Sequence, residues 1–160
     1  MLAIAVATKL VQLGYTARFI TAQSLANQLG RAATSTGRQR VMRPLLRCDV
    51  LVLDELGYLP TEPAFGPALY ELIAGRYEQR PTIITSNKSL TEWASIVQDV
   101  SLAAAVVDRV LHHGDVFYLK GPSWRVKDRA PEGVEINGQA PTLDHFYPGA
   151  WSTSMSELTA

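Results

Sequence analysis

Apolar positions in the first third of the chain repeat first at helical and then at strand-like spacing. Over residues 1–13 they recur every three or four positions, which predicts an amphipathic helix. Residues 17–20 are a short strand candidate, and Thr21 can cap a following helix that runs to about Ala33. The Ser-Thr-Gly triplet at residues 35–37 predicts a turn.

The same alternation continues in the middle of the chain. Val50–Leu53 is a continuous apolar run that ends in Asp54 and Glu55, which is typical of a strand buried on both faces of a parallel sheet. Helical spacing returns over residues 65–77, and a β-branched run at residues 82–85 predicts another strand.

The pattern weakens toward the C-terminus. Residues 101–113 have the spacing of a helix, and residues 116–119 are predicted to form a strand. Residues 128–160 contain scattered Pro and Gly without periodicity, which predicts a disordered polar tail. The alternation of strands and helices over residues 1–127 predicts an α/β fold with a parallel sheet, whose ligands bind at the carboxyl ends of the strands.

Length and composition exclude several classes of protein. A chain of 160 residues with 47% hydrophobic residues fits one globular unit with a sizeable core. The longest apolar run, Met1–Ala7, is too short to span a membrane and has no basic segment before it, so we expect a cytoplasmic protein. Cys48 is the only cysteine, which excludes an intramolecular disulfide and a zinc finger.

The charge is distributed unevenly. Residues 1–48 carry seven Lys/Arg and no Asp/Glu, whereas the rest of the chain carries eight basic and fifteen acidic residues. This pattern fits either contact with the phosphates of a nucleic acid or a solvated helix face, and the spacing alone favours neither. Five of the basic residues fall within seventeen positions: Arg31, Arg38, Arg40, Arg43 and Arg47.

Polar residues stand at the ends of two predicted strands, and these ends lie at the same edge of the predicted sheet. Asp54 and Glu55 end the first strand, and Asn87 follows the second. In phosphate chemistry Asp54 would hold Mg²⁺ and Glu55 would align or deprotonate the attacking water, while the Asn87 amide would contact a phosphate oxygen. The alternative is a pair of solvated acids and an ordinary turn residue.

Four ordered blocks resemble a known family. They are LVLDELGYLP at residues 51–60, ALYELIAGRYEQRPTIITSNKSLTEW at 68–93, LAAAVVDRVLHH at 102–113 and SWRVK at 123–127. With these blocks, residues 1–127 resemble the AAA+ helper ATPases of insertion-sequence transposition, the IstB family, whose relatives are the DnaC-type helicase loaders. The resemblance implies a P-loop NTPase core with three layers. It also implies ATP and Mg²⁺ as cofactors, DNA and a transposase as partners, and self-association into an oligomer.

The resemblance also implies roles for individual residues. Asp54 and Glu55 match the Walker B pair, with Asp54 as the metal ligand, and Asn87 matches the sensor I residue. Arg109 matches the arginine that reaches the γ-phosphate of a neighbouring subunit, and Arg125 matches the sensor II arginine. A planar guanidinium suits both places because it remains charged and binds phosphate oxygens through two parallel hydrogen bonds.

One expected motif is missing from the sequence. Family members place a glycine-rich Walker A loop ending in Gly-Lys-Thr directly before a helix that resembles residues 2–15, and here that helix begins at Leu2. We therefore expect a truncated form with impaired nucleotide binding. The alternatives are a non-enzymatic protein that binds DNA or full-length subunits and a metal-dependent nuclease, for which clustered acids are too few. The pair His112-His113 has no carboxylate or cysteine at ligand spacing in the sequence, which favours a helix C-terminal role over metal binding.

Overall fold

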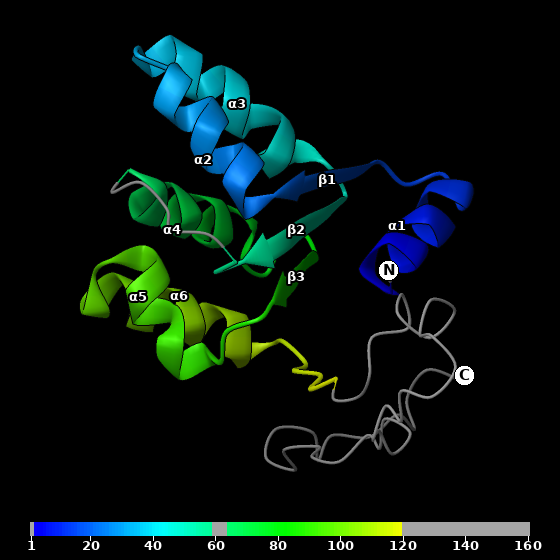
Figure 1. Ribbon diagram of the computed structural model, residues 1–160. Coiled ribbons are helices and arrows are strands. Elements are labelled where there is room, and N and C mark those ends of the chain that lie inside the picture. The colour runs from blue at the N-terminus through cyan, green and yellow to red at the C-terminus, as the bar shows by residue number, and fades with distance from the viewer. Residues whose placement is uncertain (1, 59–63, 120–160) are drawn as a thin grey trace, which may run out of the picture. The chain divides into compact units, whose positions relative to one another are not determined.

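The computed structural model describes residues 2–58 and 64–119 (Figure 1). The chain divides into two units, residues 1–114 and 115–160. All the described helices and strands belong to the first unit. None of the described helices has the length and apolar composition needed to cross a bilayer.

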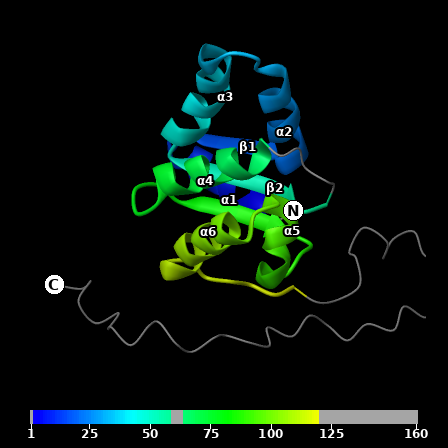
Figure 2. The same ribbon diagram turned by 90° about the vertical axis from the view of Figure 1, so that its left-hand side faces the viewer.

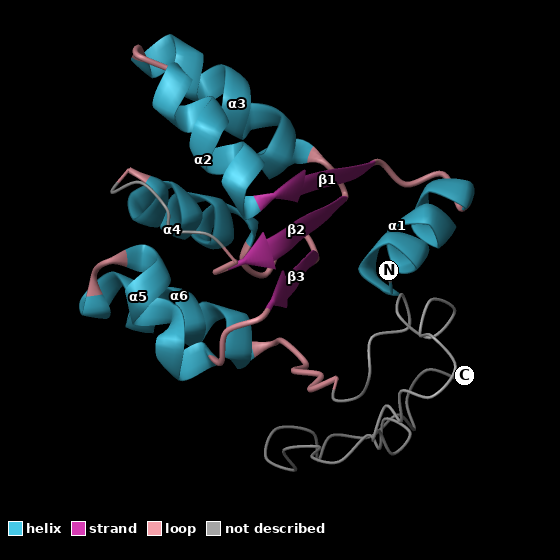
Figure 3. Ribbon diagram, viewed as in Figure 1, coloured by secondary structure: helices cyan, strands magenta, loops and turns pink. Residues whose placement is uncertain are grey.

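Three parallel strands form the sheet in the order β1-β2-β3 (Figure 3). They are β1 (Ala17–Thr21), β2 (Val50–Leu56) and β3 (Thr82–Ser86). The sheet confirms the predicted α/β fold, and it pairs the two strands that end in the candidate polar residues. Because the strands are parallel, their carboxyl ends meet at one edge.

The apolar run of β2 is continuous because helices cover both faces of the sheet. Val52 packs with Ala3 and Ala7 of α1 (Leu2–Gln12), while Leu51 and Leu53 face the larger core on the other side. Figure 2 shows α1 behind the sheet and the other helices in front of it. Helices on both faces of a parallel sheet make the three layers expected of the family.

Two helices connect β1 to β2 as a hairpin. Helix α2 (Ala22–Arg31) begins at the predicted cap, because the Thr21 hydroxyl accepts the Ser24 N–H at 3.1 Å. The predicted turn at residues 35–37 is wrong, since these residues form the first turn of α3 (Ser35–Arg47). The Thr34 hydroxyl accepts the Gly37 N–H at 3.0 Å, so the Ser, Thr and Gly residues belong to a capped helix start rather than to a loop.

The remaining helices pack over the sheet on the same side as α2. They are α4 (Phe65–Arg76), the 3₁₀ turn Leu90–Glu92, α5 (Trp93–Val97) and α6 (Val100–His112). The Asp99 carboxylate caps α6 by accepting the Leu102 N–H at 2.8 Å. Both long helices, α4 and α6, lie within one residue of their predicted bounds at each end.

One arginine joins three elements inside this layer. Arg76, at the end of α4, is only 1% exposed, and its guanidinium donates to the carbonyls of Leu45 and Pro81 at 2.7 Å each. It also donates to the Cys48 carbonyl at 2.9 Å and to the Thr82 hydroxyl at 2.9 Å. The last turn of α3 and the start of β3 are therefore held by one side chain.

The predicted strand at residues 116–119 is wrong. Residues 115–119, the described part of the second unit, form neither helix nor strand. A strand requires a neighbour for its backbone N–H and C=O groups, and none of the described strands pairs with residues 116–119. The expected disordered tail at residues 128–160 lies outside the described residues.

Candidate functional site

The sheet is irregular where the two candidate carboxylates occur. Leu53 pairs with Ile84 and Leu56 with Ser86, so Asp54 and Glu55 together face a single residue of β3, Thr85. This is a β-bulge, a feature that re-aims side chains and is common beside active sites. At the bulge the backbone of Glu55 is left-handed, with φ of 60°.

Thr85 of β3 forms hydrogen bonds with both carboxylate residues. Its hydroxyl donates to the Asp54 carboxylate and accepts the Glu55 N–H at 3.0 Å. The result is a half-buried, fixed Asp54 beside an exposed Glu55. The sequence analysis missed Thr85, although a hydroxyl at the end of the strand next to Asp54 was a usable signal.

A hydrogen bond and close packing hold together the loops that follow β2 and β3. The Ser86 hydroxyl donates to the Leu56 carbonyl at 2.7 Å. Gly57 has φ of +86°, and a Cβ there would lie 2.7 Å from side-chain atoms of both Ile96 and Lys88. Exposed Asn87 is therefore held at the same edge of the sheet as Asp54 and Glu55.

The donor set at this edge suits a magnesium ion and its phosphate ligands. Carboxylate and amide oxygens are hard ligands that Mg²⁺ prefers, and it usually keeps several waters besides one or two carboxylates. Asp54, oriented by the Thr85 hydroxyl, is the residue that could hold the ion, and Glu55 is exposed to solvent beside it. The arrangement can therefore position a hydrated cation and an attacking water.

The left-handed backbone of Glu55 has a measurable cost. A residue with a Cβ loses roughly 1–2 kcal/mol in this region, whereas glycine enters it freely. We expect Glu55→Gly to have a free energy of unfolding about 1 kcal/mol higher than Glu55→Ala, the matched control that also lacks the carboxylate. Urea unfolding followed by circular dichroism measures both. An alanine variant as stable as the glycine variant would contradict the strained bulge.

Of the two arginines predicted to contact phosphate, Arg109 lies among the described residues and Arg125 does not. Arg109 on α6 donates to the Ala105 carbonyl at 2.8 Å, and its guanidinium carbon lies 5.0 Å from the centre of the Tyr70 ring. Within the described residues it contacts neither Asp54 nor Glu55. Arg125 lies outside the described residues.

The five clustered arginines differ in their exposure and in their ion pairing. Arg38 is paired with Glu71 of α4 at 2.9 Å. Arg40, Arg43 and Arg47 are exposed at spacings of three and four along α3, which places them on one face, and they form no ion pair with the described residues. Exposed Arg31 ends the neighbouring helix α2.

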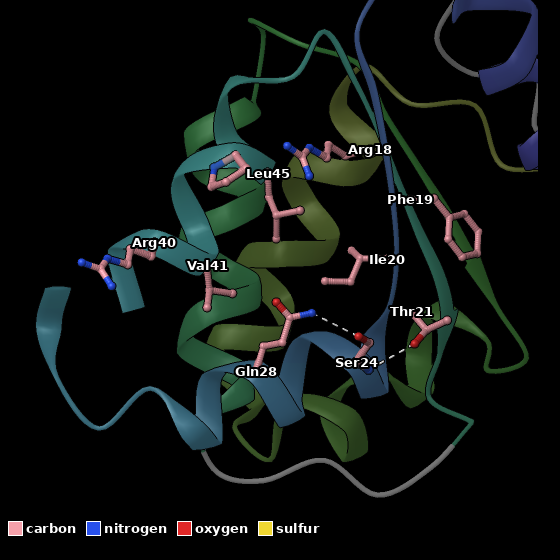
Figure 4. Close-up of a pocket in the computed structure, with 10 residues that line it drawn as sticks. Arg18, Phe19, Ile20, Thr21, Ser24, Gln28, Arg40, Val41 and Leu45 are labelled. Atoms are coloured by element: carbon pink, nitrogen blue, oxygen red, sulfur yellow. Dashed lines mark hydrogen bonds between the residues drawn. The ribbon is translucent and has the colours of Figure 1, made fainter. Parts of the chain in front are cut away.

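A hollow of about 420 Å³ lies between β1 and the α2–α3 hairpin. Figure 4 shows Arg18 and Arg40 beside it, together with Gln28, whose amide donates to the Ser24 hydroxyl at 3.2 Å. Arg18 was missed in the sequence analysis because it lies before the arginine cluster. Its position on β1, one of the two edge strands of the described sheet, adds a basic side chain to the hollow that Arg40 also lines.

Comparison with known proteins identifies relatives over most of the chain. Residues 1–131 match the family described as IstB-like ATP binding protein. A protein assigned as ATP-binding in insertion sequence IS5376 of Geobacillus stearothermophilus is 44% identical over 128 residues, covering 80% of this chain and 51% of the relative. The corresponding protein of insertion sequence IS21 from Pseudomonas aeruginosa is 35% identical over 143 residues, covering 89% and 54%. The chain thus spans about half the length of these relatives.

Solved structures agree on the fold. A DNA replication initiation factor superposes with a TM-score of 0.54 over 62% of this chain and 30% of its own. The replication initiator DnaA, bound to AMPPCP and single-stranded DNA, has a TM-score of 0.56 and covers 65% and 32%. At 13% identity each, these likenesses concern the AAA+ fold alone. The family match over residues 1–131 shows that this chain belongs to the IstB-like ATP-binding proteins.

Proposed function

We propose that this chain is the Walker B and sensor portion of an ATPase that assists DNA transposition. The observation that carries the proposal is the bulge at the end of β2, which sets a fixed Asp54 and an exposed Glu55 against Thr85. An ordinary pair of solvated loop acids needs neither a register shift nor a shared hydroxyl. Backbone strain of this kind persists where the surrounding structure holds it, and it clusters at active sites.

Each residue has a distinct part in the proposed reaction. Asp54 would hold Mg²⁺, which neutralises charge on the terminal phosphates when bound. Glu55 would orient and deprotonate the water that attacks the γ-phosphate, and Asn87 would donate to a phosphate oxygen. Arg109 and Arg125 would stabilise phosphate charge, Arg109 toward a neighbouring subunit of an oligomer and Arg125 within its own subunit.

The proposed DNA surface consists of Arg40, Arg43 and Arg47 on α3, flanked by Arg18 and Arg31. The three α3 side chains are exposed and have no acidic partner among the described residues, so they are available to phosphates. Arg38 was part of the predicted set, but its pairing with Glu71 makes it a poorer candidate. A transposase remains the partner that the family context suggests.

The DNA surface gives a salt-dependence prediction. Replacing Arg40, Arg43 and Arg47 with alanine should reduce the slope of log K against log salt for duplex DNA by about 0.9 for each phosphate that these side chains neutralise. Fluorescence anisotropy with two unrelated duplexes measures the slope and checks that binding is independent of sequence. A Lys9→Ala, Arg80→Ala variant removes basic charge from other elements and should keep the slope. An unchanged slope in the triple variant would show an ordinary solvated face.

Hydrolysis tests the catalytic part of the proposal. The decisive variant is Glu55→Gln in a chain that carries an upstream strand and a family Walker A loop ahead of Met1. It should bind Mg-ATP without turnover, whereas the same chain with Glu55 should hydrolyse it. Turnover that survives Glu55→Gln would reject the proposed role of this carboxylate, and the absence of turnover in both chains would favour a non-enzymatic DNA-binding protein.

A further inference from the structure

The ends of α4 and α6 bring together three potential metal ligands that are distant in sequence. Glu78 follows α4, while His112 is the last residue of α6 and His113 its C-terminal cap. One ligand atom from each of the three side chains lies within 4.8 Å of the other two. The sequence showed the histidine pair without an acidic partner, and the fold supplies one from 34 residues earlier.

Contacts among these side chains already orient them. His113 Nε2 lies 2.9 Å from a Glu78 carboxylate oxygen. The Tyr77 hydroxyl is hydrogen-bonded to His112 Nδ1, and the two histidine rings have centroids 4.1 Å apart. Glu78 itself has a left-handed backbone, with φ of 56°. The tight end of α4 therefore directs Glu78 toward α6.

We propose that Glu78, His112 and His113 form a site for a divalent transition-metal ion such as Zn²⁺. Imidazole nitrogen and carboxylate oxygen are the usual ligands of zinc, which commonly takes three protein ligands and a water. Metal–ligand distances of about 2.0–2.2 Å in a tetrahedral site put the ligand atoms about 3.3–3.6 Å apart, so ligand atoms that lie within 4.8 Å of one another would move closer by up to roughly 1.5 Å on binding. Glu78 and His113 have side chains 55% exposed, which leaves them free to make this adjustment and leaves room for water.

The donor set separates this site from the proposed nucleotide site. Mg²⁺ prefers oxygen ligands and retains its water, so two imidazoles select against it. The ion would also join two helices, because Glu78 belongs to the end of α4 and both histidines to the end of α6. Since α6 carries Arg109 one turn before His112, an ion here would stabilise the helix that presents this arginine.

Titration of the untagged full chain with Zn²⁺ and with Co²⁺ tests the site. We expect one equivalent to bind by calorimetry, a Co²⁺ visible absorption band, and a rise in melting temperature that Mg²⁺ does not produce. Glu78→Gln keeps the side-chain size and should weaken binding at least about tenfold, as should His113→Ala. His145→Ala, which removes the third histidine of the chain, is the matched control and should bind as the parent does.

The outcomes separate the alternatives. Equal affinity in the parent and in Glu78→Gln would overturn the proposal and leave only a surface histidine pair. Loss of binding in His145→Ala would assign the ion to a different set of ligands, and absence of Zn²⁺ and Co²⁺ binding in the parent would also overturn it. Circular dichroism of each variant confirms that it is folded before it is scored.

Discussion

The 160-residue chain is expected to bind Mg-ATP several thousandfold more weakly than the same chain carrying a family Walker A loop. The sequence has no Gly-Lys pair, so these residues alone supply neither the backbone N–H cradle nor the lysine that bind β- and γ-phosphates. Hydrogen bonds to charged groups contribute about 1.5–3 kcal/mol each, so a site without three of them binds more weakly by roughly 5 kcal/mol. That difference moves a micromolar site into the millimolar range.

The carboxylates at the sheet edge do not compensate for these hydrogen bonds. Asp54 and Glu55 repel phosphate unless a metal ion lies between them, and in the family that ion also uses the hydroxyl of the Walker A Ser/Thr. Calorimetry of both chains with Mg-ATP measures the difference. In the extended chain, Glu55→Gln should leave the dissociation constant within a few-fold and remove turnover. Micromolar binding by the 160 residues would mean that other side chains build the phosphate site.

The second large effect is expected at Arg76. Burial lowers the pKa of this guanidinium, which still remains protonated because arginine ordinarily titrates so far above neutrality. Replacing it with methionine keeps most of the volume but removes the hydrogen bonds that the guanidinium donates to the carbonyls of Leu45, Cys48 and Pro81. We expect Arg76→Met to reduce the free energy of unfolding by about 3–5 kcal/mol, a large share of the stability of a small domain.

A matched variant isolates the buried hydrogen bonds from a general loss of positive charge. Arg43→Met makes the same chemical change at an exposed position of α3 and should change the free energy of unfolding by less than about 0.5 kcal/mol. Urea denaturation followed by tryptophan fluorescence, to which buried Trp93 contributes, compares the two. Equal stability in the two variants would show that the guanidinium of Arg76 contributes no more than a surface charge.

Local patterns predicted most of the regular elements. The continuous apolar run of β2 was a strong enough local signal to locate that strand. The helical spacing of apolar residues did the same for α4 and α6. Helices α3 and α5 were not predicted, and two of the predictions are wrong for reasons that short-range patterns do not contain. The Ser-Thr-Gly triplet at residues 35–37 occurs in turns and in capped helix starts alike, and a strand at residues 116–119 depends on a backbone partner elsewhere.

The charged and amide residues of the candidate site were predictable from the sequence, but Thr85 and the geometry were not. Position at the end of a buried run pointed to Asp54, Glu55 and Asn87. The bulge and the Thr85 hydroxyl depend on the register between two strands, which the sequence of either strand alone does not contain. The burial of Arg76 was also indicated by the sequence. Arg76 continues the buried stripe of Leu69, Leu72 and Ile73, on the face where α4 otherwise places apolar side chains.

The buried guanidinium also links distant parts of the molecule mechanically. Arg76 holds the last turn of α3 and the first residues of β3, and the other end of β3 carries Thr85 with its bond to Asp54. Arg76 and β3, which pairs with β2, therefore form a continuous connection from the last turn of α3 to the carboxylate pair. The same side chain that stabilises the fold thus lies between the helix that carries the exposed arginines and the strand that carries Thr85.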